Sequence, residues 1–200
     1  MSVQPHVLYL HGFLSSPQSL KAQQTLAYCS EIGMRERITI PLMSHGPAET
    51  IAQLHSLIEE IGADELVLMG SSLGGYYASY LSEFYGAPAV LINPAVRPFE
   101  LWESHLGENK NYYSDEIHVV TREHIEELKQ IHIEVLSKPE NIQAYLQTGD
   151  ETLDYRQALE KFGPAQCVVH ENGSHSYDDF ERELPLMFDF FLSRIGPNKR

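Results

Sequence analysis

Short and nearly continuous hydrophobic runs recur along the chain, separated by longer stretches with helical periodicity. Such runs are typical of strands that are buried on both faces of a parallel sheet. The pattern predicts six strands, at Val7–Leu10, Arg37–Ile40, Leu66–Met69, Ala89–Ile92, Gln143–Gln147 and Cys167–His170. It also predicts six helices, at Pro17–Ile32, Ala48–Ile61, Leu73–Tyr85, Val119–Ile133, Tyr155–Phe162 and Tyr177–Ile195. This alternation indicates the α/β class, as a three-layer α/β/α sandwich with a mostly parallel sheet.

One segment, Arg97–His118, interrupts the alternation with polar and aromatic residues that have no clear periodicity. It follows the predicted strand that ends before Asn93-Pro94. Long irregular insertions in small domains are often lids or binding loops, although a plain surface excursion fits the pattern equally well. We therefore expect a single domain over residues 1–195, with a short lid at 97–118 as one interpretation and a C-terminal tail at 196–200.

Composition and charge disfavour nucleic-acid-binding, membrane and disulfide-rich secreted proteins. The 200 residues suit one domain, and the net charge of −14 repels phosphate backbones, so nucleic-acid binding is disfavoured. No apolar run approaches the roughly 20 residues of a membrane span, so we expect no membrane association. Two cysteines, Cys29 and Cys167, are too few for a disulfide framework, and the first residues lack a signal-peptide pattern. A cytoplasmic location is the resulting expectation.

The sharpest local motif is Gly70-Ser71-Ser72-Leu73-Gly74, which joins a predicted strand to a predicted helix. A G-x-S-x-G pattern at such a junction is typical of a nucleophile elbow, where the tight turn leaves room only for small residues beside the serine. A glycine-rich turn that only allows close packing, or one that cradles a phosphate, is the alternative; the lysine of a P-loop is absent. We interpret Ser72 as a nucleophile and the backbone N–H of Leu73 as an oxyanion donor.

A serine nucleophile needs a base and a group that orients the base, here expected in the order Ser, acid, His. His175 lies in the turn-rich segment after the last predicted strand and is the predicted base, whereas His170 belongs to the strand itself. Asp150 is the first carboxylate after the preceding strand and is the favoured acid. Asp154 is the alternative, with a helix N-cap as its other possible role.

The loop after the first predicted strand, His11-Gly12-Phe13, can supply the second oxyanion donor through the N–H of Phe13. The candidates for an acyl-binding pocket are four large side chains, which equally fit a role in the core: Leu14, Tyr76, Trp102 and Tyr112. Neither H-E-x-x-H nor Cys-x-x-Cys occurs, and His118, His124 and His132 lack the i, i+4 spacing of helical ligands, so we expect no metal.

Together, five motifs resemble the α/β-hydrolase superfamily, and more closely its small bacterial YqiA-type esterases: Leu10-His11-Gly12-Phe13, Gly70-Ser71-Ser72-Leu73-Gly74-Gly75, Asn93-Pro94, Thr148-Gly149-Asp150-Glu151 and Gly173-Ser174-His175. The resemblance spans nearly the whole chain. It implies an esterase acting on acyl esters, including acyl-CoA thioesters, with Ser72, Asp150 and His175 as the triad.

The expected reaction is acyl transfer to water through an acyl-enzyme, which requires no cofactor. The expected partner is a small-molecule acyl ester or thioester, and the chain is expected to be a monomer or a small homo-oligomer. Two alternatives stay open. The same triad can cleave a carbon–carbon or peptide bond, and the fold can serve as a non-catalytic binding module.

Overall fold

The computed structural model describes residues 4–163 and 166–195, so the tail expected at 196–200 lies outside the described residues. Its main sheet has six parallel strands in the order β2-β1-β3-β4-β7-β8. These strands are β1 (His6–Leu10), β2 (Ile38–Thr39), β3 (Leu66–Ser71), β4 (Ala89–Ile92), β7 (Ile142–Gln147) and β8 (Cys167–His170). The predicted parallel sheet is therefore confirmed.

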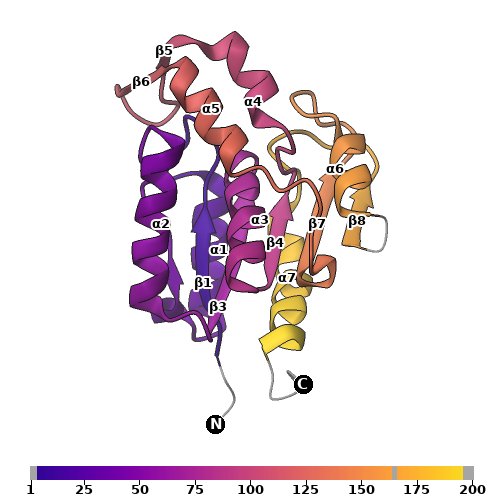
Figure 1. The fold of residues 1–200 in the computed structure, drawn as a ribbon. Helices are drawn as coiled ribbons and strands as arrows, with labels where there is room; N and C mark the ends of the chain where they lie inside the picture. Colours follow the sequence, from indigo (N-terminus) through magenta and orange to yellow (C-terminus); the bar gives the residue numbers. More distant parts are fainter. Residues whose placement is uncertain (1–3, 164–165, 196–200) are drawn as a thin grey trace.

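Helices cover both faces of this sheet (Figure 1). One face packs against α1 (Leu20–Glu31) and α7 (Phe180–Ile195). The other packs against α2 (Pro47–Ile61), α3 (Leu73–Tyr85) and α6 (Tyr155–Phe162). The predicted three-layer α/β/α arrangement is confirmed as well.

The central strands are buried because alternate residues enter the two cores. On β1, Leu8 packs on the side of α2 and α3, while Val7 and Tyr9 pack on the side of α1 and α7. All six residues of β3 are buried, which explains its continuous hydrophobic run. The edge strand β8 is only half-buried, with Val169 40% exposed. The hydrophobic pattern was therefore strongest for the strands at the centre of the sheet.

The segment expected to be irregular contains regular structure. It forms a short helix α4 (Pro98–Leu101), a 3₁₀ helix (Trp102–His105) and an antiparallel hairpin of β5 (Gly107–Lys110) and β6 (Ile117–Val120). We call residues 97–121 the lid segment, because they contain the stretch 97–118 for which a lid was one interpretation. It lies over the carboxyl ends of the parallel strands, as Figure 1 shows.

Several predicted boundaries differ from the structure. The helix expected from Val119 begins at Arg122 as α5 (Arg122–Gln130), because Val119 is paired in β6 and Thr121 caps the helix by accepting the His124 N–H. Helix α7 begins three residues later than expected, since Tyr177 has a positive φ of 64°. Two further 3₁₀ helices, Arg35–Arg37 and Pro139–Asn141, precede β2 and β7.

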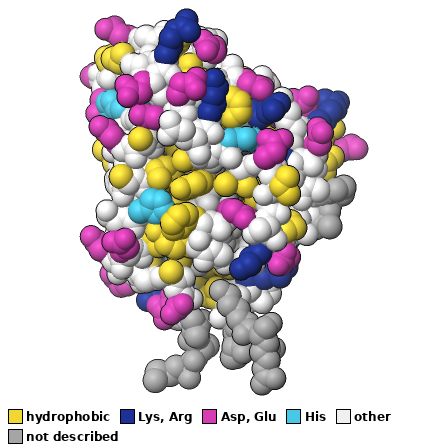
Figure 2. Space-filling model, in the orientation of Figure 1, with side chains coloured by type: hydrophobic (Ala, Val, Ile, Leu, Met, Phe, Trp, Pro, Cys, Tyr) yellow, Lys and Arg dark blue, Asp and Glu magenta, His cyan; other side chains and the backbone are white. Residues whose placement is uncertain are grey.

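Acidic side chains are spread over the surface drawn in Figure 2, and hydrophobic side chains gather in the middle of that face. On the layer of α2 and α3, Phe84 is 63% exposed and its ring lies 4.9 Å from that of His55. None of the helices in the described ranges is both long and apolar enough to cross a bilayer.

Candidate active site

Ser72 occupies the turn between β3 and α3, at the carboxyl edge of the sheet. Its backbone has φ 56° and ψ −120°, a conformation that is strained for any residue with a side chain. The turn is fixed by two hydrogen bonds to β4 and the segment after it. Ser72 N–H donates to the Ile92 carbonyl and the Ala95 N–H donates to the Ser72 carbonyl, both at 3.0 Å. Such strain is characteristic of functional sites, where the surrounding structure holds it in place.

The two glycines that flank Ser72 are required by packing. A Cβ atom on Gly74 would overlap the Leu10 carbonyl oxygen, and one on Gly70 would overlap the Gly74 carbonyl oxygen. Both are backbone atoms that cannot move aside without shifting the strand or the helix. The structure therefore gives the steric reason for the G-x-S-x-G spacing that the sequence motif indicated.

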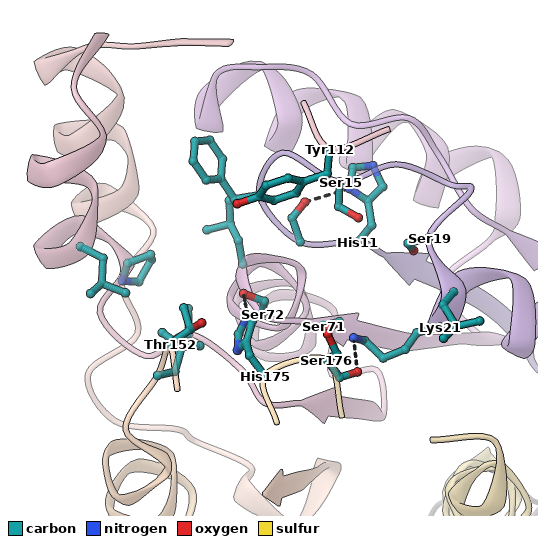
Figure 3. Close-up of a pocket in the computed structure, with 18 of the residues that line it drawn as sticks. His11, Ser15, Ser19, Lys21, Ser71, Ser72, Tyr112, Thr152, His175 and Ser176 are labelled. Carbon is teal, nitrogen blue, oxygen red and sulfur yellow. Dashed lines mark hydrogen bonds between the residues drawn. The ribbon is translucent and has the colours of Figure 1, made fainter. Parts of the chain in front are cut away.

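A chain of hydrogen bonds runs from Ser72 through His175 to Asp150. Figure 3 shows the contact between Ser72 and His175. His175 Nε2 lies 3.1 Å from Ser72 Oγ, and His175 Nδ1 lies 2.8 Å from Asp150 Oδ2. The Asp150 side chain is 2% exposed and that of His175 is 24% exposed. Asp150 Oδ1 also accepts the N–H groups of Thr152 and Leu153, each at 2.8 Å. The carboxylate is thereby held in one orientation, facing the imidazole.

The alternative acid and base lie elsewhere. Asp154 is the N-cap of α6 and accepts the Arg156 N–H at 3.0 Å. His170 stands on β8, with its Nε2 3.3 Å from Glu183 Oε1. The structure thus brings Asp150 and His175, and not Asp154 or His170, to Ser72.

Three polar side chains that the sequence analysis did not assign hold the loop that carries His175. Gln147 Oε1 accepts the Ser174 N–H at 3.0 Å, and Asn93 Nδ2 donates to the Ser174 carbonyl at 2.9 Å. Glu151 accepts the His175 N–H at 3.0 Å, and this hydrogen bond lowers the pKa of the Glu151 carboxyl. Gln147 and Asn93 are buried at the ends of strands β7 and β4, and no local sequence pattern indicates their contacts with this loop.

The loop after β1 lies directly against Ser72. A Cβ on Gly12 would stand 3.3 Å from Ser72 Cβ, so the two backbones are nearly in contact. The Phe13 N–H donates no hydrogen bond within the described residues, and the Leu73 N–H belongs to the first turn of α3, where amides have no partner in the helix. Both candidate oxyanion donors are therefore unpaired amides beside the serine.

His11 fixes the geometry of this loop. Its Nδ1 lies 3.0 Å from the Gly12 carbonyl oxygen, and its Nε2 accepts the Met43 N–H at 3.4 Å. Burial lowers the pKa of His11, with the nearby His118 acting in the same direction. A neutral imidazole protonated on Nδ1 satisfies both contacts. His11 is accordingly a structural residue of the loop.

A cavity of about 360 Å³ opens beside Ser72 and beneath the lid segment. Trp102 and Tyr112 line it, as the sequence analysis expected. Leu14 and Tyr76 do not: Leu14 lines a separate small cavity, and the Tyr76 hydroxyl is buried and donates to the Leu128 carbonyl at 2.7 Å. Their interpretation as pocket residues differs from the structure, because Leu14 turns away at a φ of 55° and Tyr76 packs beneath α5.

Comparison with known proteins places this geometry in a family. The model of the family described as uncharacterised protein family UPF0227 matches residues 6–192. The chain belongs to this family. A UPF0227 protein of Shewanella sp. (strain ANA-3) is 24% identical over 196 residues, which cover 94% of this chain and 99% of that protein. Membership in UPF0227 confirms the resemblance to YqiA-type α/β-hydrolases that the motifs indicated.

Solved structures show the same fold for this UPF0227 member. The alpha/beta hydrolase domain-containing protein 10 from mouse superposes with a TM-score of 0.74 at 15% identity, covering 98% of this chain and 92% of that chain. Est1E from Butyrivibrio proteoclasticus superposes with a TM-score of 0.68 at 13% identity, covering 96% and 88%. At these identities the likeness establishes the α/β-hydrolase fold.

Beside the cavity, the lid segment of this UPF0227 protein meets the loop after β2 through a cluster of His45, Glu116 and His118, which the sequence did not indicate. The rings of His45 and His118 stack with centroids 3.6 Å apart at 19°, and His45 Nε2 lies 3.0 Å from Glu116 Oε1. Their ligand atoms lie within 4.8 Å of one another. An imidazole binds a metal ion in the plane of its ring, at roughly 2.1 Å from the nitrogen. The planes of these two stacked rings are nearly parallel, so no single position lies in both planes at that distance. The arrangement fits a packing contact that fastens the lid better than it fits a metal centre.

Proposed function

We propose that this protein is a serine hydrolase that cleaves acyl esters of small molecules through Ser72, His175 and Asp150. The observation that carries the proposal is the continuous hydrogen-bonded chain of these three side chains, at 3.1 and 2.8 Å, in a strained elbow facing a cavity. The cavity volume of about 360 Å³ fits a small ligand. No cofactor is needed for this reaction.

The geometry suggests how the steps proceed. As Ser72 Oγ attacks the ester carbonyl carbon, His175 Nε2 takes the hydroxyl proton and passes it to the leaving alcohol. Asp150 keeps the proton of the imidazole on Nδ1 and stabilises the imidazolium. The negative oxygen of the tetrahedral intermediate lies between the Phe13 and Leu73 N–H groups. A water molecule activated by His175 then hydrolyses the acyl-enzyme and frees the acid.

Residues 97–118 are proposed to act as a short lid on a single domain spanning 1–195. The Tyr112 N–H donates to the Leu14 carbonyl at 2.9 Å and Asn111 Nδ2 donates to the Ser15 carbonyl at 3.1 Å. These bonds join the hairpin to the loop that carries Phe13. Thioesters, including acyl-CoA, belong to the same proposal, because the same attack and the same leaving-group protonation serve a thioester carbonyl.

The proposal is tested by labelling the native protein with a serine-directed fluorophosphonate and measuring hydrolysis of 4-nitrophenyl esters. We expect Ser72→Ala to lose the label and to lower kcat by about 10⁴-fold or more, because the nucleophile is absent. Ser56→Ala, on the exposed surface of α2, is the matched control and is expected to keep the label and the native kcat. Equal labelling of the native protein and Ser72→Ala would refute the proposal.

A carbon–carbon hydrolase or a peptidase on the same triad is the second candidate. A diketone substrate and an aminoacyl-nitroanilide, run beside the esters, separate these activities. The ester proposal requires the highest kcat/KM on the esters, whereas labelled protein without ester turnover favours the second candidate. A non-catalytic binding module requires that no substrate is turned over and that Ser72 is not labelled.

A further inference from the structure

The cavity beside Ser72 has a polar end that the reaction itself does not use. Lys21, in the first turn of α1, reaches across to the loop that follows His175 (Figure 3). Its Nζ donates to the Ser176 carbonyl at 2.7 Å, and this is its one hydrogen-bond partner in the described part of the chain. An ammonium group has three donors, so at least two of them are free to face a ligand. Among the described residues that line the cavity, Lys21 is the one lysine or arginine.

Tyr9 contributes a second, independent feature of the same cavity. Its side chain is fully buried on the α1 side of the sheet, and its hydroxyl has no hydrogen-bond partner among the described residues. Tyr9 also lines the cavity. Buried hydroxyls nearly always find a partner, so a water molecule or a ligand in the cavity would complete the hydrogen bonding of this one.

The charge of the cavity differs from that of the molecule. The chain carries a net charge of −14, yet no aspartate or glutamate appears among the described residues that line this cavity. The acid of the triad, Asp150, already accepts hydrogen bonds from His175, Thr152 and Leu153. The ammonium of Lys21 therefore faces a cavity without a carboxylate of its own to neutralise it.

The remaining walls divide the cavity in two. Hydroxyl groups surround the end that holds Lys21: Ser19, Ser71 and Ser176. Large apolar side chains from the lid segment and the loop after β7 line the rest: Pro98, Leu101, Trp102 and Leu153. A ligand that fits both parts has an apolar portion and a negatively charged portion, with the ester between them at Ser72.

We propose that Lys21 and Tyr9 form an anion-binding subsite, so that the preferred substrates of this hydrolase are esters that carry a carboxylate. The subsite rests on the proposed hydrolase function. The Lys21 ammonium pairs with the carboxylate, and the Tyr9 hydroxyl donates to one of its oxygens. A charge-assisted pair of this kind is expected to favour the anionic ester over a neutral isostere by about 10- to 100-fold in kcat/KM.

The test compares each carboxylate ester with its carboxamide isostere, in two arms. The mono-4-nitrophenyl ester of glutaric acid carries the anion on the acyl side, and 4-carboxyphenyl acetate carries it on the leaving group. The preference is the ratio of kcat/KM for the carboxylate to that for the carboxamide. We expect a preference in one arm that falls about 10- to 100-fold in Lys21→Met and also falls in Tyr9→Phe.

Controls separate this role from a structural one. Lys129→Met removes the same charge from an exposed pair with Glu126 on α5 and keeps the native preference. Lys21→Arg retains the charge and restores most of the preference. If Lys21 only anchors the His175 loop through Ser176, Lys21→Met lowers kcat/KM for both isosteres equally, and this result overturns the subsite.

A pH profile gives a second readout. Burial lowers the pKa of Lys21 to about 8, against an opposing effect of Asp150. The other titratable groups among the described residues that line the cavity are Tyr9, His11, His105, Tyr112, Tyr113 and His175. The ammonium is charged below this pKa, so the preference is complete below pH 8 and declines as the pH rises above it, since kcat/KM reports the free enzyme. A preference that rises with pH between 6.5 and 9.5 contradicts the proposal, because the ammonium can only lose charge over that range.

The outcomes for the two proposals are distinguishable. Suppose that the protein turns over esters and is labelled by the fluorophosphonate, but shows no preference in either arm. That result overturns the subsite and leaves the hydrolase proposal intact, and so does a preference that Lys21→Met leaves unchanged. Absence of turnover together with absence of labelling overturns the hydrolase, and the subsite with it.

Discussion

Asp150 and Asp154 are four residues apart, yet their surroundings give them different roles. The Asp150 side chain is buried. One of its carboxylate oxygens faces His175 Nδ1 and the other accepts hydrogen bonds from two backbone amides. Asp154 is half-exposed and caps α6. The sequence favoured Asp150, as the first carboxylate after the strand, and kept Asp154 as the alternative. What decides between them is where the loop folds relative to a histidine 25 positions away.

This difference yields a matched pair of variants. Asp150→Asn is expected to lower kcat about 10⁴-fold, because the amide favours the wrong imidazole tautomer and cannot stabilise the imidazolium. Asp154→Asn is expected to retain both activity and stability, because asparagine is an equally good N-cap. Ester hydrolysis and thermal unfolding of the two variants check this. Similar losses of kcat in both would show that neither aspartate has a specific role.

Residues that act through contacts with distant parts of the chain could not be predicted from the sequence either, because their roles depend on how the loops fold together. Gln147 and Asn93 position Ser174, and Lys21 reaches Ser176 across 155 positions. No local pattern encodes such contacts. By contrast, the glycines around Ser72 act on their immediate neighbours, and their role could be inferred from spacing.

At the scale of elements, the central strands and most helices follow from periodicity, because burial on two faces leaves a continuous hydrophobic run. The lid segment does not. Burial alternates along β6, but its exposed positions are the apolar Ile117 and Val119, at 44% and 50%, and one of its buried positions is His118. Hydrophobicity therefore does not follow burial along this strand. What fixes it is contact with the main body, above all the stack of His118 on His45 and the packing of Trp102 on Phe13.

The stacked histidines make the attachment of the lid sensitive to pH. Burial, and then the charge of His45, lower the pKa of His118, while Glu116 opposes the shift. The folded-state pKa thus lies below the unfolded value of about 6.5, so the unfolded chain binds the proton more readily. The stabilising contribution is complete above pH 6.5 and is lost as the pH falls through the lowered pKa.

The variant His118→Phe keeps a ring in the stack but cannot be protonated. We therefore expect its Tm to fall less than that of the native protein when the pH is lowered from 7.5 to 5. A difference of about 2–4 °C corresponds to 1 kcal/mol in a chain of this size. His55→Phe, on α2 outside the lid, is the control and retains the native pH dependence. If the Tm of His118→Phe and the Tm of the native protein fall by the same amount, the stack has no role in the pH response.

At the scale of the whole molecule, the question is whether the lid unfolds with the rest of the protein. The chain has a single tryptophan, Trp102, and it lies in the lid segment. Its side chain is 4% exposed, and its ring centroid lies 4.7 Å from that of Phe13. Trp102 belongs to the same apolar core as α2 and α3. The lid therefore shares buried surface with the main body instead of forming a core of its own.

Shared burial predicts a single cooperative transition, because the lid cannot expose Trp102 without also opening the core beneath it. We expect the urea midpoint measured by tryptophan fluorescence, which reports the lid, to coincide with that measured by far-UV circular dichroism, which reports the whole fold. In Phe13→Leu, where the ring contact is lost, the fluorescence midpoint is expected to shift to lower urea than the dichroism midpoint. A fluorescence transition that comes first in the native protein would mean that the lid opens separately, so that access to Ser72 would be set by lid stability.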